Sequence, residues 1–467
     1  MFGVAVAQTG IPGSGWWTGE QVQNVGAATA NIVVTAYDKN GAATFSASQS
    51  VAAGAAFTFV PSNFAGMPSG FQGSAVVSSD QPIKAIVAVT NQLAGTLGVA
   101  GGKGVAQYQG TESVDTALYF PLAKNNRFGN STAFYIQNAG TAAASVTAVF
   151  KMDTGGTYTH TVASVDPNKM VVINPGDAGV PSTAGSGRDN IGSLKVTSAQ
   201  PLAGTVLEYI QGQAVATVLF GTRGFTASDF DDKAYAPVVK NARANHFTGL
   251  QVQNVSAGAI DVTVNYVGSA GVCAGLTYTD TASAVAAGAS KTFVQLTGQS
   301  TLPANCTASA TINATGNFVA IVNEQNMPST SLAGITSSAI ADSAKTAKIS
   351  APLFKDRRSG SSTGLQIQNV GAVAATNVVV TFACKGAATF TAISTPQTIQ
   401  AGGAKLFLRP SAMPAGTFTV GNPFSSNNVN CAVTVTADQP VVAIANEFAD
   451  TTGNMDDTNY EGFNLVP

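Results

Sequence analysis

Short runs in which apolar and polar residues alternate recur along the whole chain. The run from Ile260 to Tyr266 is a clear case, with apolar residues at every second position. Such alternation turns one face toward a core and the other toward solvent, as in an antiparallel strand. These runs are rich in Val, Ile, Thr, Phe and Tyr, and Gly, Asn, Asp or Pro separates them. No segment sustains a helical period, so the pattern predicts an all-β protein.

One strand signature returns four times. It reads TGEQVQN, TAFYIQN, TGLQVQN and TGLQIQN, and its closing asparagines are Asn24, Asn138, Asn254 and Asn369. A proline stands eleven residues before the last three signatures, in FPLAKN, APVVKN and APLFKD. Spacings of 114, 116 and 115 residues between the asparagines indicate four copies of one domain-sized unit. The predicted domains are 1–115, 116–230, 231–346 and 347–467.

Each copy has the length and strand spacing of a small β-sandwich. An immunoglobulin-like sandwich of about 100 residues fits every copy. A jelly roll is the alternative, because the sequence does not fix the order of the strands.

Charge is scarce in this chain. Only 10% of the residues are charged and the net charge is −2. No basic surface for nucleic acid is therefore expected. No apolar run of about 20 residues occurs, so no membrane-spanning segment is expected either. A surface with few charges also lowers the cost of packing one copy against another.

The four cysteines fall in the last two copies. Cys306 and Cys431 stand at matching positions, so we expect one disulfide in each copy, Cys273–Cys306 and Cys384–Cys431. Disulfides indicate an oxidising compartment, and we expect the protein to be secreted or on the cell surface. The start, MFGVAVAQ, reads either as the remnant of a signal peptide or as a β-strand.

The motifs carry a resemblance. The Pro-x-x-Lys-Asn strand, the TGLQVQN strand and the following Gly-rich turn resemble the tandem immunoglobulin-like repeats of secreted surface proteins in filamentous bacteria. The resemblance covers almost the whole chain and implies an architecture and a location. It implies no catalytic residues.

The ends of the chain suggest a mode of assembly. The tail after the fourth copy ends 115 residues after Pro352, where a fifth copy would begin, and it is built like the internal linkers. We therefore expect it to dock on another subunit, in analogy with donor-strand assembly of pili. The residues expected to carry this docking are Tyr460, Phe463, Leu465, Val466 and Pro467 in the tail. In the reverse direction they are Phe2, Val4 and Val6 at the start.

Both tryptophans of the protein, Trp16 and Trp17, lie in the first copy. The matching positions of the other copies are mostly polar. Tryptophan is enriched at interfaces, so the pair is a candidate for the same assembly segment. Packing under its own loop, or stacking on a sugar, are the alternatives.

No constellation of catalytic residues repeats, and we expect no enzymatic activity. The two histidines lie in different copies, which gives no support to a Ser-His-Asp arrangement. No cofactor is expected. Asp229, Asp231 and Asp232 are candidate calcium ligands at a domain joint, and solvated linker charges are the alternative account.

These observations predict a structural subunit of an extracellular filament, fibre or sheath that polymerises head to tail with copies of itself. The alternative is a monomeric adhesin or carbohydrate-binding stalk. Asn-x-Ser/Thr sequons at Asn130, Asn254, Asn305 and Asn313 make attached glycans a further expected partner.

Overall fold

The structure is a computed structural model of the chain. It describes residues 2–3, 10–13, 15–39, 43–91, 104–154, 156–182, 187–211, 218–326, 334–358, 361–385, 390–408, 413–414, 416–418, 429–449, 458–461 and 463–464.

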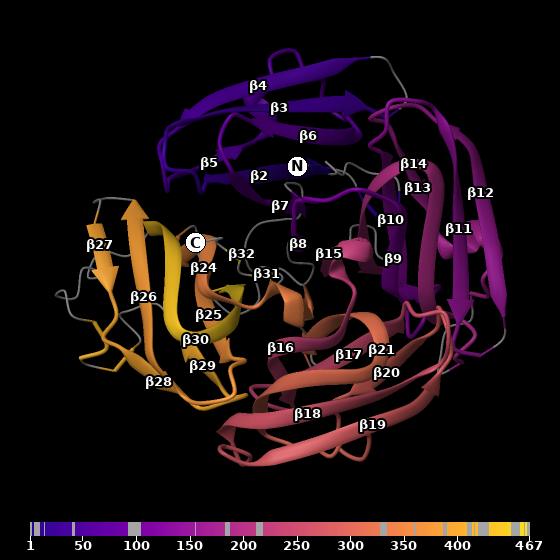
Figure 1. Ribbon diagram of the computed structural model, residues 1–467. Coiled ribbons are helices and arrows are strands. Elements are labelled where there is room, and N and C mark those ends of the chain that lie inside the picture. Colours follow the sequence, from indigo (N-terminus) through magenta and orange to yellow (C-terminus); the bar gives the residue numbers. More distant parts are fainter. Residues whose placement is uncertain are drawn as a thin grey trace.

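The first repeat folds into two four-stranded antiparallel sheets (Figure 1). One sheet has the order β1-β6-β3-β4 and the other the order β5-β2-β7-β8. Pro82 lies between β6 and β7, whereas the equivalent Pro201 and Pro440 lie within single long strands of the second and fourth repeats. The strands are β1 (Phe2–Gly3), β2 (Trp16–Asn24), β3 (Ala30–Asp38), β4 (Thr44–Val51), β5 (Ala56–Phe59), β6 (Gly73–Ser79), β7 (Ile83–Asn91) and β8 (Val105–Gln109).

In the other three repeats one long strand takes the place of β6 and β7 and belongs to both sheets. In the second repeat, the first half of β14 pairs with β11 and its second half pairs with β10. The strands of this repeat are β9 (Asp115–Lys124), β10 (Asn130–Asn138), β11 (Ala144–Met152), β12 (Thr157–Val165), β13 (Met170–Ile173), β14 (Ile191–Ile210) and β15 (Leu219–Arg223).

The third and fourth repeats follow the same plan. The third comprises β16 (Asp231–Asn241), β17 (His246–Asn254), β18 (Ile260–Gly271), β19 (Thr277–Val285), β20 (Ser290–Val294), β21 (Cys306–Asn326), β22 (Gly334–Ser338) and β23 (Ile340–Ala341). The fourth comprises β24 (Thr346–Asp356), β25 (Ser361–Asn369), β26 (Ala375–Lys385), β27 (Phe390–Ile393), β28 (Gln397–Ile399), β29 (Ala404–Phe407), β30 (Val429–Ala449), β31 (Thr458–Glu461) and β32 (Phe463–Asn464).

Helical structure in the described residues is limited to short 3-10 turns. These are η1 (Pro61–Asn63), η2 (Pro175–Ala178), η3 (Ala227–Asp229) and η4 (Asp342–Ala344). The prediction of an all-β protein of antiparallel strands is confirmed. Among the described residues no helix has the length and apolarity needed to cross a membrane.

Each repeat buries its own apolar core. The alternation predicted for the third repeat is confirmed, since Ile260, Val262, Val264 and Tyr266 are all at most 2% exposed. The equivalent strand of the second repeat buries Val146, which lies in the core of that repeat with Phe134 and Phe150. The hydrophobic effect therefore stabilises each folded repeat, or lobe, separately.

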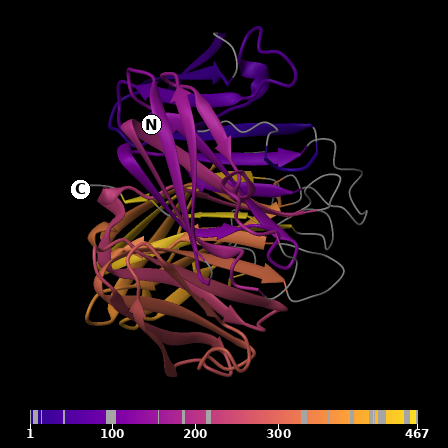
Figure 2. The same ribbon diagram turned by 90° about the vertical axis from the view of Figure 1, so that its right-hand side faces the viewer.

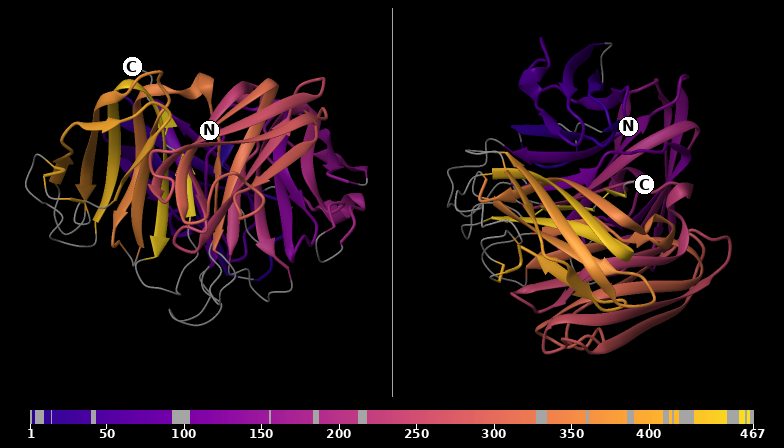
Figure 3. Two further views of the ribbon diagram at one scale, coloured as in Figure 1. Left: turned by 90° about the horizontal axis from the view of Figure 1, so that it is seen from below. Right: turned by 60° about the vertical axis from the view of Figure 1, so that its left-hand side comes forward.

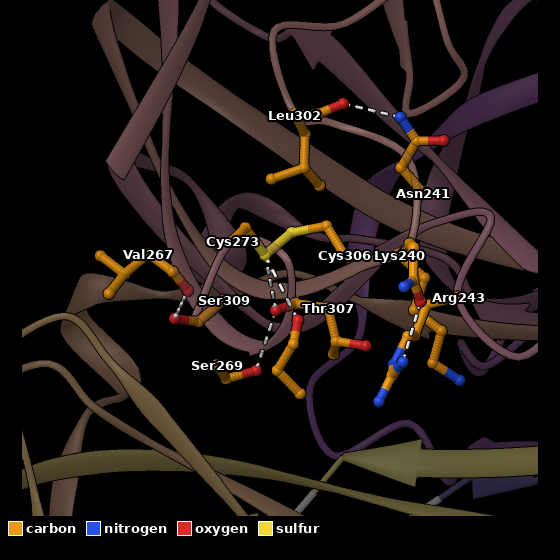
Figure 4. The surroundings of a disulfide bond; sticks show 12 residues. Lys240, Asn241, Arg243, Val267, Ser269, Cys273, Leu302, Cys306, Thr307 and Ser309 are labelled. Atoms are coloured by element: carbon orange, nitrogen blue, oxygen red, sulfur yellow. Dashed lines mark hydrogen bonds between the residues drawn. A yellow bond between two sulfur atoms is a disulfide. The ribbon is translucent and has the colours of Figure 1, made fainter. Parts of the chain in front are cut away.

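Both expected disulfides are present. Cys273 bonds to Cys306 and Cys384 bonds to Cys431. Figure 4 shows that the first bond joins the segment after β18 to the start of β21. Close by, Asn241 Nδ2 donates a hydrogen bond of 2.6 Å to the carbonyl oxygen of Leu302. The disulfide and this hydrogen bond fix the loop that precedes the long strand of the third repeat.

The four repeats are arranged around a common centre and not in a row. In Figure 1 they follow one another from indigo through magenta and orange to yellow, and the fourth repeat comes to lie beside the first. The view from below in Figure 3 shows the lobes side by side in one layer. Figure 2 shows the same arrangement from its edge.

Candidate functional site

Four short strands meet at the centre of the molecule, one from each repeat. They are β8, β15, β22 and β31. β8 pairs with β7, and each of the other three pairs with the long strand of its own repeat. β8 contacts β15, β15 contacts β22, β22 contacts β31, and β31 contacts β8. This cyclic order makes the molecule a closed ring, which the sequence did not predict.

A second layer of contacts has the same cyclic order. In the second and third repeats the first strand lies against two strands of the next repeat: β9 contacts β17 and β21, and β16 contacts β25 and β30. For the fourth repeat the next one around the ring is the first, and β24 contacts β2 and β7. The contact that closes the ring is thus equivalent to contacts between chain neighbours.

A serine hydroxyl joins each of the first three repeats to its successor. Ser193 Oγ donates to the carbonyl oxygen of Gly288 at 2.6 Å, and Ser309 Oγ donates to that of Gly402 at 2.7 Å. Ser74 donates to Asn168 in the same way. All three acceptors have positive φ, between 62° and 74°, a backbone conformation that Gly and Asn tolerate best.

The closing contact uses different polar groups. The register of β30 places Ala432 where the second and third repeats have serine. Instead, Ser350 Oγ of β24 donates to Gln23 Oε1 of β2 at 2.7 Å, and both side chains are buried. A buried hydrogen bond between the fourth and first repeats therefore takes over the role of the missing serine.

Three repeats carry an equivalent ion pair between a half-buried lysine and a buried glutamate. The pairs are Lys124–Glu208 at 2.6 Å, Lys240–Glu324 at 2.5 Å and Lys355–Glu447 at 2.5 Å. Two of these glutamates also accept a hydrogen bond from a neighbouring repeat. Asn323 Nδ2 donates to Glu208 at 3.1 Å, and Gln107 Nε2 donates to Glu447 at 3.4 Å across the closing contact. The lysines belong to the repeated proline motif, but their glutamate partners were not recognised from the sequence.

The first repeat has a carboxyl group in its interior where the other repeats have an apolar side chain. The register of β2 places Glu20 where the other repeats have Phe134, Leu250 and Leu365. Glu20 is 5% exposed, and burial raises its pKa to about 7. Its Oε2 atom has no hydrogen-bond partner among the described residues. Burial together with the nearby Glu20 carboxylate also raises the pKa of Tyr108.

Trp16 is buried between the first two repeats. It is 6% exposed and packs in an apolar cluster that includes Tyr108 of the first repeat and Tyr135 and Leu207 of the second. Its Nε1 atom donates to the carbonyl oxygen of Pro12 at 3.2 Å. Trp17 is half-buried. Trp16 thus lies at an interface within the chain.

The terminal strands pair inside the chain. Phe2 of β1 lies opposite Val76, Tyr460 of β31 opposite Ala445, and Phe463 of β32 opposite Ser350. The sequence led us to expect unpaired ends that dock on a neighbouring subunit. The observed pairings lie within the first and the fourth repeat, and docking on a neighbouring subunit stays a prediction. Val4, Val6, Leu465, Val466 and Pro467 lie outside the described residues.

The three candidate calcium ligands do not form a cluster. Arg223 binds the carboxylate of Asp229 with hydrogen bonds of 2.6 and 2.9 Å. Burial acts to raise the pKa of Asp229, but this guanidinium holds it below its usual value. Asp231 accepts hydrogen bonds from the backbone N–H groups of Lys233 and Ser343, and Asp232 is exposed. Within the described part of the chain, no group of three or more His, Cys, Asp or Glu could hold a metal ion.

A cavity of about 370 Å³ lies where the first three repeats meet. It opens at the ends of β8, β15 and β22, next to the linkers that lead to the following repeats. Five charged side chains line it: Lys84, Glu112, Arg223, Asp229 and Asp231. This cavity could not be predicted from the sequence, because its lining residues come from three repeats that are distant in the chain.

The comparisons with known proteins leave the family of this chain open. No protein-family profile matches it. No curated protein matches it. Among solved structures, a Thermotoga maritima protein designated 1070 matches 24% of this chain and 92% of its own, at 20% identity and a TM-score of 0.20. A glycoside hydrolase of family 32 from Bifidobacterium adolescentis matches 95% of this chain and 99% of its own, at 9% identity and a TM-score of 0.15.

Proposed function

We propose that this protein is a structural component of the cell exterior whose working unit is a closed ring of four β-sandwich lobes. One observation carries the proposal: the central strands contact one another in cyclic order, including β31 with β8. A ring closed on itself is rigid, since each lobe is held by two neighbours. Such a body suits a spacer or building block better than a flexible chain of beads does.

Composition and covalent structure support a location outside the cytosol. One disulfide lies within the third repeat and one within the fourth, and both fit an oxidising environment. With 10% charged residues, the repeats lose little hydration energy when they pack on one another.

The immunoglobulin-like class of each lobe is part of the proposal. In the second repeat, the second strand pairs with the fifth (β10 with β13) and the third with the sixth (β11 with β14). Immunoglobulin domains pair their B and E strands and their C and F strands in the same way. The lobes differ in that the sixth strand continues into the opposite sheet.

Head-to-tail polymerisation stays a hypothesis with an added condition. Because β1, β31 and β32 pair inside the chain, docking through the terminal segments requires those pairs to open and re-form between molecules. Such an exchange is a domain swap. Assembly of intact rings through their outer surfaces needs no opening.

Negative-stain electron microscopy of purified protein tests the proposal. We expect compact four-lobed rings, either isolated or joined into ordered arrays. Extended rods of four beads would overturn the ring as the working unit. A hydrolytic activity on envelope polymers, lost on substitution of residues at one site, would overturn the structural role.

A carbohydrate-binding role is the second candidate. The cavity between the first three repeats favours this role, because both hydroxyl groups and apolar side chains line it.

A further inference from the structure

The cavity at the junction of the first three repeats is lined by residues at repeated positions. Gln109, Arg223 and Ser338 occupy the same register position on β8, β15 and β22. A second set, Ser113, Ser228 and Ser343, contributes one serine from each of the three linkers, spaced 115 residues apart. The first three repeats therefore line the cavity with side chains able to form hydrogen bonds.

Four of the five charged side chains in the wall form ion pairs with each other, and the fifth, Asp231, accepts backbone hydrogen bonds. Lys84 Nζ lies 2.6 Å from Glu112 Oε2, and Arg223 Nη2 lies 2.6 Å from Asp229 Oδ1. Asp231 holds two backbone N–H groups. A charged ligand would have to compete with one of these partners and leave the other uncompensated, at a cost in desolvation. The wall thus favours a ligand without net charge.

The remaining wall combines hydroxyl groups with apolar surface. Ser113 Oγ lies 2.9 Å from Ser228 Oγ, and Phe225, Phe318 and Ile340 line the same space. A serine hydroxyl both donates and accepts, so it matches another hydroxyl in either sense. A molecule with hydroxyl groups on its rim and C–H groups on its face would satisfy both kinds of wall.

The size of the cavity limits the ligand. At about 370 Å³ it is at the small end of the range of roughly 300–1,000 Å³ for small-molecule pockets. It is far larger than the roughly 30 Å³ that one water molecule occupies. We infer that this cavity binds a neutral, hydroxyl-rich small molecule of the size of a monosaccharide or disaccharide.

Isothermal titration calorimetry with the full chain tests this inference. The probes are neutral hexoses, N-acetylhexosamines and their disaccharides, with glucuronate and inorganic phosphate as charged counterparts. We expect saturable one-to-one binding of at least one neutral sugar and weaker binding of both anions. Absence of saturable binding by every neutral sugar, or tighter binding of the anions, would overturn the inference.

A cavity-filling variant ties binding to this site. Ser343→Trp places a large side chain in the cavity wall, while the hydrogen bond that the backbone N–H of Ser343 donates to Asp231 can persist. We expect the affinity to fall by about tenfold or more, equivalent to about 1.4 kcal/mol. The matched control is Ser48→Trp at an exposed position of β4, which should bind as the unchanged protein does. Sugar binding that survives Ser343→Trp at full strength would overturn the site.

Scattering data on the same samples separate this inference from the proposed function. A ring-shaped protein that binds no neutral sugar would overturn only the ligand. An extended protein would overturn the ring, and with it the cavity between the repeats.

Discussion

The contact between the fourth and first repeats and the contact between the second and third repeats bury equivalent strands, but a linker joins only the second pair. Ile86 packs against the core of the fourth repeat, and Ile321, at the same register position, packs against Leu122 of the second repeat. Both isoleucines are at most 2% exposed. The apolar part is thus conserved around the ring, whereas the polar part changes from Ser193 with Gly288 to Ser350 with Gln23. The ring is therefore closed by complementary surfaces and needs no covalent connection at that point.

The largest effect is expected from a charge placed in the closing contact. Ile86→Asp would bury an unpaired carboxylate against the fourth repeat, at a cost of about 3–5 kcal/mol, and should open the ring. Small-angle X-ray scattering should show an increased radius of gyration. Ile321→Asp should increase it less, because the linker still restrains the second and third repeats. Val33→Asp, at a 38% exposed position of the first repeat, is the control and should change neither size nor stability.

The lysine–glutamate ion pairs offer a second way to compare repeats. Lys240→Met leaves Glu324 buried without its cation and should lower the free energy of unfolding by about 3 kcal/mol or more. The first repeat has Val89 where the third has Glu324. Adding Glu324→Val to Lys240→Met should therefore restore most of the loss in urea denaturation. A double variant as unstable as the single one would contradict this account of the pair.

Glu20 makes the first repeat sensitive to pH. Its pKa of about 7 in the folded protein lies above its ordinary value of 4.5. A carboxyl group with a raised pKa contributes stability that is present below about pH 4.5 and is lost as the pH rises through 7. The loss should approach about 3 kcal/mol. The difference in unfolding free energy between Glu20→Gln and the unchanged protein should grow over this range. A pH-independent difference would show that Glu20 is not buried as described.

The smallest effect is expected at the serine contacts. Ser309→Ala removes the hydrogen bond to Gly402 and should cost about 1 kcal/mol. The fourth repeat already has Ala432 at this position, so a small loss fits what the chain tolerates. Urea denaturation measures it, with Ser48→Ala as the control at an exposed position. A loss in unfolding free energy above about 3 kcal/mol would contradict the assignment of a single hydrogen bond to this hydroxyl.

Much of the local structure could be predicted from the sequence. Alternation at Ile260 to Tyr266 indicates which face is buried, and the matching positions of Cys306 and Cys431 indicate the disulfides. These are properties of a single repeat, and each depends on residues that lie within one repeat of the sequence.

The ring could not be predicted in this way, because it depends on how repeats pack on one another. Ser193 and Ser309 carry the contacts between repeats, yet in sequence they are ordinary strand serines. Lys240 was visible in its motif, but its partner Glu324 lies 84 residues away. Trp16 indicated an interface, but the sequence did not tell whether its partner is another molecule or the next repeat.

Small-angle X-ray scattering of the unchanged protein in dilute solution tests the central claim most directly. Four lobes of about 115 residues in a closed ring should give a radius of gyration of about 23–28 Å, and the same lobes in a straight row about 40 Å. The account predicts the smaller value together with a four-lobed compact envelope. A radius near the larger value would contradict the closed ring.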